Sequence, residues 1–300
     1  MQGDRPGHAA AAIERHLNLA ALKSRCLPAR CQRDRSVCLA RRSHDAGDDE
    51  CEEETTTHES PPSVAAPMYP FRARYPLRNW SFVFEKIHVI GAGRVGSAVS
   101  ARLREQGIAA DEEAELVLLC VPDAAISDVA RKIPTGPWIA HVSGATPLAA
   151  LDPHERRFSV HPLQTFTRAR GAEQLDGAWA AVTADSDEGR DRGFWLARAL
   201  RLRPFELADD ARSLYHAGAA VASNYLVTLH EVAAELFRAA GAPPDALIPL
   251  MRRTIDNGFE LTGPIERGDW ETVEAHRRAI RAAKPDLEPL YDVLAEVTAR

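Results

Sequence analysis

Residues 86–123, KIHVIGAGRVGSAVSARLREQGIAADEEAELVLLCVPD, decide the fold of this chain. A short apolar run leads into the pattern G-x-G-x-x-G, and a helix-forming stretch and a second apolar run follow. In such a setting the first glycine permits a tight turn, the second lets a diphosphate approach the backbone, and the third lets helix and strand pack closely. The free N–H groups at the start of the helix bind phosphate. The pattern predicts a dinucleotide-binding loop. Its expected cofactor contacts are Gly91, Gly93, Arg94, Val95 and Gly96, and for Arg94 an exposed side chain without a phosphate contact stays open as the alternative.

The stretch from Gly107 to Glu115 is too short for the second strand and second helix that such a unit usually contains. A parallel crossover takes about a dozen residues or more, so the helix expected over 95–106 should run directly into the strand expected over 115–121. In the strand order 3-2-1-4-5-6 that strand already neighbours the first one. Because roughly 98% of crossovers are right-handed, three outcomes stay open: the helix changes face, the crossover is left-handed, or residues 108–114 form an irregular edge.

The acidic residues of this short stretch, Asp111, Glu112 and Glu113, lie near the distance at which a carboxylate normally binds the cofactor's ribose. Only Ile108, Ala109 and Ala110 stand between them and the preceding glycine. A solvated acidic loop is the preferred interpretation, and a ribose site is the alternative. Each of the three outcomes disturbs the adenosine half of the cofactor site.

The chain divides into three parts. Residues 1–80 combine opposite charge blocks with a proline-bearing stretch and no sustained apolar periodicity, which is typical of disorder. Residues 81–208 alternate short apolar runs with helical stretches, which predicts an α/β fold with a Rossmann-like parallel sheet that lacks the second-strand region. Residues 209–300 carry only helical signals and predict an all-α domain, beginning with one long helix over 210–240 that ends at Gly241.

Composition excludes several classes of protein. A formal net charge of -6 and a pI near 6.0 give no reason to expect a nucleic-acid partner. No apolar run is long enough for a membrane span, and the charged first residues do not resemble a secretory signal. Four of the five cysteines lie before residue 60 with irregular gaps, so a thiol-bearing tail is preferred to a zinc site and no metal is predicted. A reducing, cytoplasmic setting fits best.

Six stretches in order carry a family resemblance: IGAGRVG, LVLLCVPDAAI, HVSGATPL, SVHPLQTF, YHAGAAVASNYLVTL and LTGPIERGDWETVEAH. From residue 86 to the C-terminus the chain resembles Rossmann-like NAD(P)-dependent oxidoreductases with a helical C-terminal domain of unassigned function, relatives of pyrroline-5-carboxylate reductase, ketopantoate reductase and the β-hydroxyacid dehydrogenases. The resemblance implies NADP, or else NAD, as cofactor, a small-molecule substrate of the oxo-acid or imine type, and a homodimer through the helices of 209–300. The cofactor contacts it adds are Val121, Pro122, Ser143 and Gly144.

Reduction of a carbonyl needs a hydride from nicotinamide and a proton for the developing alkoxide, and histidine suits the second role. His161 ends a predicted strand, where open α/β sheets bind ligands. His216 and Asn224 lie eight residues apart on one face of the long helix. In the β-hydroxyacid dehydrogenases the comparable helix carries a Lys and, four residues later, an Asn. Asn224 matches that Asn, but Ala220 stands at the Lys position.

Proton donation would therefore fall to His216 or His161, while Asn224 holds the substrate oxygen. Purely structural roles for all three residues stay open. Cys120 is interpreted as a buried apolar residue, His141 as support for the Ser143 loop, and Arg267 and Asp269 as helix caps.

The favoured function is NAD(P)H-dependent reduction of a small 2-oxo acid or related carbonyl or imine, with ketopantoate as the leading candidate. A non-catalytic dimeric scaffold or sensor with a disabled nucleotide pocket is the alternative.

Overall fold

The structure, a computed structural model, describes residues 84–300, so the predictions about residues 1–80 and their four cysteines lie outside the described residues. The chain divides into two units, Met1–Arg72 and Ala73–Arg300, and all described residues belong to the second. The strands are β1 (Ile87–Ile90), β2 (Leu116–Leu119), β3 (Trp138–His141), β4 (Arg157–Leu163), β5 (Trp179–Ala184) and β6 (Arg203–Glu206). The helices are α2 (Arg94–Glu105), α3 (Ile126–Ala130), α4 (Asp187–Ala199), α5 (Arg212–Ala220), α6 (Leu226–Ala239), α7 (Leu247–Asp256), α8 (Trp270–Ala283) and α9 (Glu288–Thr298).

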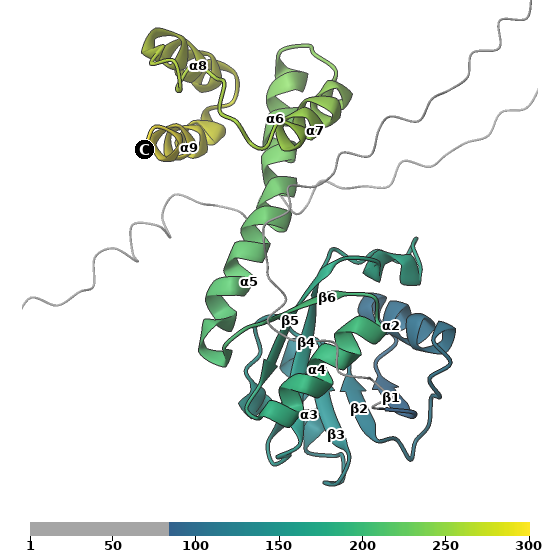
Figure 1. Ribbon diagram of the computed structural model, residues 1–300. Coiled ribbons are helices and arrows are strands. Elements are labelled where there is room, and N and C mark those ends of the chain that lie inside the picture. The colour runs from purple at the N-terminus through teal and green to yellow at the C-terminus, as the bar shows by residue number, and fades with distance from the viewer. Residues whose placement is uncertain (1–83) are drawn as a thin grey trace, which may run out of the picture. The chain divides into compact units, whose positions relative to one another are not determined.

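The six strands form one sheet in the order β1-β2-β3-β4-β5-β6 (Figure 1). All neighbouring pairs are parallel except β4 and β5, which are antiparallel. The Rossmann-like α/β prediction is confirmed. The helix after the glycine loop does lead into a strand that pairs with the first one, with Ile87 opposite Leu116.

A single residue occupies the position beside β1 where the second strand of such a unit would lie. Ala109 forms an isolated parallel bridge with Lys86, accepting a hydrogen bond from the backbone N–H of Ile87 and donating to the carbonyl of Glu85, each at 3.0 Å. Since Glu115 donates to the carbonyl of Lys86 (3.1 Å), Ala109 and β2 lie on opposite edges of β1. Of the three outcomes left open by the sequence, the structure has the irregular edge.

This edge also resolves the question of handedness. Helix α2 packs on one face of the sheet and α3 on the other. A right-handed β2–α3–β3 crossover leads away from β1. Helix α2 lies on the opposite face, so the connection from β1 through α2 to Ala109 is also right-handed. The chain then crosses to β2.

The acidic stretch is a surface loop at the N-terminal end of β1. The Asp111 carboxylate pairs with the Lys86 amine at 2.8 Å and accepts a hydrogen bond from the Glu113 N–H at 2.9 Å. The hydrogen bond from Lys86 holds the pKa of Asp111 below its usual value. The Glu115 carboxylate accepts from the Glu85 N–H at 2.7 Å. The interpretation as a solvated acidic loop is confirmed, because these contacts lie at the end of β1 away from the glycine loop.

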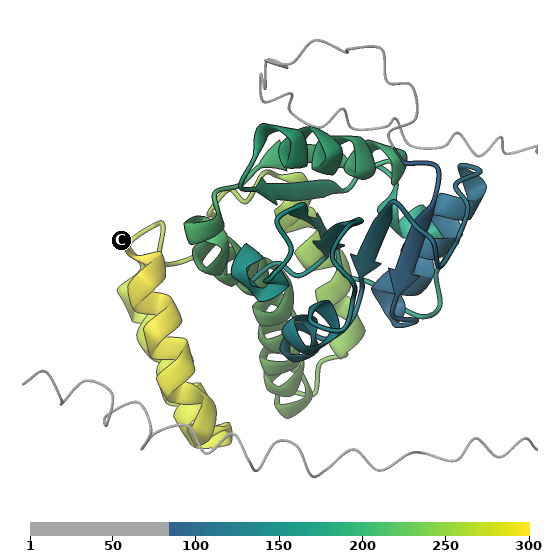
Figure 2. The same cartoon turned by 90° about the horizontal axis from the view of Figure 1, so that it is seen from below.

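The sheet separates two apolar layers. Leu103 of α2 and Leu196 of α4 pack with Leu118 on one face, whereas Ile126 of α3 packs with Leu119 on the other. Figure 2 shows α4 lying along one side of the strands. Strand β2 is buried along its whole length, while β1 is partly exposed beyond Ile87 because it has only Ala109 beside it.

The predicted long helix is continuous over α5 and α6, but a five-residue π-helix, Val221–Tyr225, joins them. Such π-helical turns are frequent at functional sites. The helix ends at Gly241, which has φ +75°, as the sequence predicts. Asp269 caps α8, accepting from the Thr272 N–H at 3.1 Å, and Arg267 donates to the carbonyl of Thr262 in the preceding turn. Within 84–300 no helix is long and apolar enough to cross a membrane.

Candidate functional site

The glycine loop between β1 and α2 has two glycines that pack and one that stays uncovered. A methyl group on Gly91, which has φ +117°, would lie 2.3 Å from the carbonyl oxygen of Cys120, and one on Gly96 would lie 1.9 Å from that of Gly91. These two positions let β1, α2 and β2 approach closely. A methyl group on Gly93 would meet no atom within 4 Å, and no side chain caps the start of α2. The backbone here is open to a diphosphate, as expected for the second glycine of the motif.

A cavity of about 750 Å³ lies beside this loop. Three segments far apart in the sequence form its wall: the start of α2, the end of β4 with the residues that follow, and the α5 helix with the π-helix. Its lining residues include five of the predicted site residues, namely Arg94, Val95, His161, His216 and Asn224. Among the described residues that line it, Arg94 is the only Arg or Lys.

The imidazole of His161 is one of the polar side chains that line this cavity. Its Nδ1 is 2.8 Å from the hydroxyl oxygen of Tyr215, and its ring centroid is 6.0 Å from that of His216. A methyl group on Gly144 would lie 2.8 Å from Nε2 of His161 and 2.7 Å from Cδ2 of His216, so only glycine lets both rings pack against this loop.

Burial sets the charge states of His161 and Tyr215. Desolvation, with smaller contributions from the nearby His216 and Arg212, lowers the pKa of His161 to about 4. Burial raises the pKa of Tyr215 to about 12. At neutral pH His161 is therefore uncharged and Tyr215 keeps its proton.

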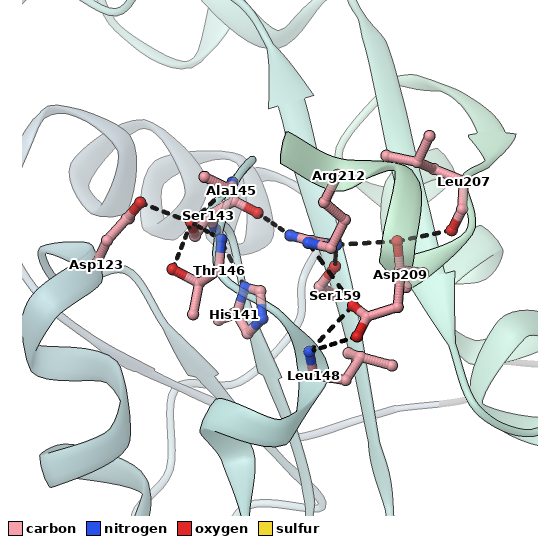
Figure 3. Close-up of polar contacts among 11 residues, drawn as sticks. Asp123, His141, Ser143, Ala145, Thr146, Leu148, Ser159, Leu207, Asp209 and Arg212 are labelled. Atoms are coloured by element: carbon pink, nitrogen blue, oxygen red, sulfur yellow. Dashed lines mark hydrogen bonds and ion pairs between the residues drawn. The ribbon is translucent and has the colours of Figure 1, made fainter. Parts of the chain in front are cut away.

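The buried Arg212 fixes the position of α5 on the sheet (Figure 3). Its guanidinium donates to the hydroxyl oxygens of Ser159 (2.6 Å) and Thr183 (2.9 Å) and to the carbonyl of Ser143. The Asp209 carboxylate lies 3.8 Å from its Nε. These contacts connect the first turn of α5 to β4, β5 and the loop after β3. Tyr215, one turn later, is thereby held over the end of β4.

The loop after β3 is held by its own polar side chains, as Figure 3 shows. The Ser143 hydroxyl lies 2.8 Å from the Asp123 carboxylate and accepts hydrogen bonds from the N–H groups of Ala145 (3.2 Å) and Thr146 (3.0 Å). His141 accepts from the Ser143 N–H at 3.2 Å, which confirms its predicted supporting role, and burial lowers its pKa to about 3.

The remaining predicted cofactor contacts lie outside the cavity wall. Gly91 packs against the end of β2, where a methyl group on Gly91 would lie 3.3 Å from the backbone nitrogen of Val121. Pro122 follows in the same loop. Ser143 is buried, and its hydroxyl makes the hydrogen bonds just described. Cys120 is buried and its thiol pKa is raised to about 12 by desolvation, as expected for a structural cysteine.

Sequence reasoning missed Tyr215 and Arg212. Tyr215 is adjacent to the predicted His216, but nothing in the sequence shows that β4 returns beneath α5. Arg212 resembles any solvated arginine on the first turn of a helix until its burial, at 1% exposure, is seen. In residues 84–300 no group of three or more His, Cys, Asp or Glu side chains could hold a metal ion.

Comparisons with known proteins support the fold. Residues 178–298 match the family model of a domain of unknown function, DUF2520. No curated protein matches the chain. A Bacteroides fragilis protein proposed to be an NADP oxidoreductase is similar at 22% identity and a TM-score of 0.60, covering 71% of this chain and 97% of its own. A Thermotoga maritima protein is similar at 24% identity and a TM-score of 0.59, with coverage of 70% and 96%.

A reductive aminase from Aspergillus terreus, solved with NADPH and ethyl-5-oxohexanoate, is similar at 17% identity and a TM-score of 0.50, with coverage of 72% and 93%. At these identities the similarity establishes the architecture: a Rossmann-like sheet followed by helices.

Proposed function

We propose that this protein is an NADP(H)-dependent oxidoreductase, able to use NAD(H), that reduces a small carbonyl or imine compound. The observation that carries the proposal is the cavity of about 750 Å³, which joins the start of the glycine-loop helix to His161, His216 and Asn224. The names of the Bacteroides and Aspergillus proteins, which share the architecture, point to the same class of reaction.

The residues present fit the diphosphate and nicotinamide part of such a cofactor. The open backbone at Gly93 and the uncapped start of α2 would bind the diphosphate, and Arg94 would neutralise part of its charge. The loop of Ser143 and Gly144, with Val121 and Pro122, would border the nicotinamide. When bound in its reduced form, the cofactor supplies a hydride to the substrate carbon.

The chain's own residues would supply the proton and hold the substrate. His216, in the cavity wall, is the donor we favour between the two histidines, because His161 is uncharged at neutral pH and is not an imidazolium acid. The amide of Asn224 would donate a hydrogen bond to the substrate oxygen. The π-helix that carries Asn224 supports a role in binding rather than in packing alone.

The substrate class is broader than the one named from the resemblance. The residues assigned to the substrate in the cavity wall, His161, His216 and Asn224, suit the carbonyl group of any small 2-oxo acid. Ketopantoate therefore stays one candidate among such acids. We place the reaction in the cytoplasm, as the sequence predicts.

We also propose a homodimer through the helices of 209–300. In residues 84–300 all exposed large hydrophobic side chains except Leu163 and Trp179 lie in this region, and Leu214 is 81% exposed. Exposed apolar surface on this scale is typical of an interface. Because the resemblance implies dimerisation through these helices, a second copy of the chain is the expected partner.

A titration of the full chain with NADPH and NADH tests the proposed function. We expect either dinucleotide to shift the intrinsic fluorescence at micromolar concentration and to raise the melting temperature. If neither raises it at millimolar concentration, the oxidoreductase proposal is wrong. The shortened edge beside β1 would then favour the second candidate, a non-catalytic dimeric scaffold or sensor.

A further inference from the structure

We infer that, within residues 84–300, the cofactor site binds the diphosphate and nicotinamide parts of a dinucleotide and presents no side chain dedicated to the adenosine ribose. NADH and NADPH are then bound with similar affinity, and the smaller reduced nicotinamide mononucleotide is also a ligand. The inference rests on the proposed function, since it concerns the same site.

The first observation is that the second strand, beside β1, is reduced to one residue. In a dinucleotide-binding unit the second strand carries, at its carboxyl end, the side chain that binds the adenosine ribose. Here the strand is reduced to Ala109, which pairs at the level of Lys86 and Ile87, near the start of β1. The chain then turns back at Asp111 and crosses to β2. Within 84–300 the edge of β1 next to the glycine loop thus has no second strand to present a ribose-binding side chain.

The second observation is that two carboxylates of this segment, those of Asp111 and Glu115, are engaged elsewhere. Asp111 pairs with Lys86 at 2.8 Å, and Glu115 accepts a hydrogen bond from the Glu85 N–H at 2.7 Å. Both contacts lie at the N-terminal end of β1. The glycine loop follows the opposite end of the same strand, at Gly91. A carboxylate at Asp111 cannot therefore select the 2′-hydroxyl of NADH or repel the 2′-phosphate of NADPH.

The third observation is that the other half of the site is complete. Gly91 and Gly96 have the close backbone contacts of an intact loop, and the surface at Gly93 is uncovered. Arg94 lines the cavity that also contains His161 and Tyr215, so its charge lies toward the reacting end of a bound cofactor. The contacts that remain are common to NADH and NADPH, and the mononucleotide keeps those to the nicotinamide and to one of the two phosphates.

The affinities follow from these contacts. A dedicated carboxylate that binds the ribose discriminates between the two dinucleotides by about tenfold or more, since a hydrogen bond to a charged group is among the stronger ones. Without it, we expect the dissociation constants of NADH and NADPH to agree within about threefold. The mononucleotide, which keeps the nicotinamide and one phosphate, should bind within about tenfold of NADH.

The test is calorimetric titration of the full chain with NADH, NADPH and reduced nicotinamide mononucleotide at one ionic strength. Asp111→Asn is titrated in parallel. It should fold normally, because the Lys86 pair is exposed and contributes little to stability, and its affinity for NADH should stay within about threefold of the parent's.

Three results would overturn the inference while leaving the proposed function intact. The first is a preference above tenfold for either dinucleotide, whichever segment of the full chain supplies it. The second is a mononucleotide that fails to bind at concentrations where NADH saturates the site. The third is a tenfold loss of NADH affinity in Asp111→Asn. A chain that binds none of the three ligands contradicts the proposed function itself.

Discussion

The Nδ1 atom of His161 and the hydroxyl oxygen of Tyr215 are 2.8 Å apart, and both side chains line the cavity that contains the predicted catalytic residues. Because Tyr215 is protonated and His161 is uncharged at neutral pH, the pair is a neutral hydrogen-bonded unit that can orient a substrate or pass on a proton. Tyr215→Phe removes only the hydroxyl and keeps the ring that packs on Phe205. We expect kcat to fall about 10- to 100-fold, with the dissociation constant of NADPH unchanged.

The chain contains a matched control for this substitution. His276 and Tyr291 form the same kind of pair, at 2.9 Å, outside the residues that line the cavity. Tyr291→Phe should leave kcat unchanged in the same steady-state assay. Equal losses in both variants would show that the hydroxyl of Tyr215 acts through folding alone.

Substitutions at two glycines of the loop, Gly93 and Gly96, are expected to have opposite phenotypes. Gly93→Ala places a methyl group in open space, so its melting temperature should stay within a degree or two of the parent's, whereas its affinity for NADPH should fall by tenfold or more because the methyl group occupies the diphosphate position. Gly96→Ala forces a methyl group to 1.9 Å from the Gly91 carbonyl and should lower the melting temperature by several degrees. Thermal denaturation and NADPH titration separate the two, and a Gly93→Ala variant with full affinity would contradict a diphosphate at this loop.

The sequence predicts the order of elements well because the signals are local. The apolar run at 87–90, the glycine spacing and the helix end at Gly241 each depend on a few neighbouring residues, and the structure has all three. The adjacency of β1 and β2 follows from two facts: residues 108–114 are too short for a crossover, and the next strand in the order 3-2-1-4-5-6 already neighbours the first.

The proximity of Tyr215 to His161 could not be predicted, because it depends on distant pairings. The antiparallel β5 and the burial of Arg212 against Ser159 and Thr183 bring α5 onto the end of β4, and this is what makes Tyr215 a neighbour of His161. The π-helix at Val221–Tyr225 contains no glycine or proline that would mark a change of helix type in the sequence. The single bridge of Ala109 was open among three alternatives, because handedness is a property of the sheet and not of the segment.

Arg212 should be the most sensitive charged residue of the described chain. Arg212→Met keeps much of the volume but leaves the Ser143 carbonyl and the Ser159 hydroxyl buried without their donor. We expect a loss of about 3 kcal/mol in the free energy of unfolding, measured by urea denaturation. Arg131→Met is the control, because its exposed pair with Asp128 contributes little, roughly 0.5 kcal/mol or less. Similar losses in both variants would refute a supporting role for the Arg212 contacts.

Light scattering should give twice the mass of one chain if the helical region is an interface. Val227 on α6 and Val297 on α9 are both more than half exposed, and Val227→Glu or Val297→Glu would bury a carboxylate at such an interface. We expect at least one of the two to raise the dimer dissociation constant by tenfold or more, while Lys132→Glu, an exposed change near the end of α3, leaves it unaltered. A monomer at every concentration would rule the dimer out.

The buried His141 predicts how stability changes with pH. Its folded-state pKa is lowered to about 3 by desolvation, whereas an unfolded histidine has a pKa near 6.5. Between these values the unfolded chain takes up a proton that the folded chain does not, so acid favours unfolding. The contribution is fully present above pH 6.5 and declines as the pH falls, by at most about 1.4 kcal/mol per pH unit. In urea denaturation between pH 6.5 and pH 4, His141→Gln should show a shallower decline than the parent, since it has no group to protonate. An identical slope in both proteins would mean that His141 is already protonated, or accessible to protons, in the folded state.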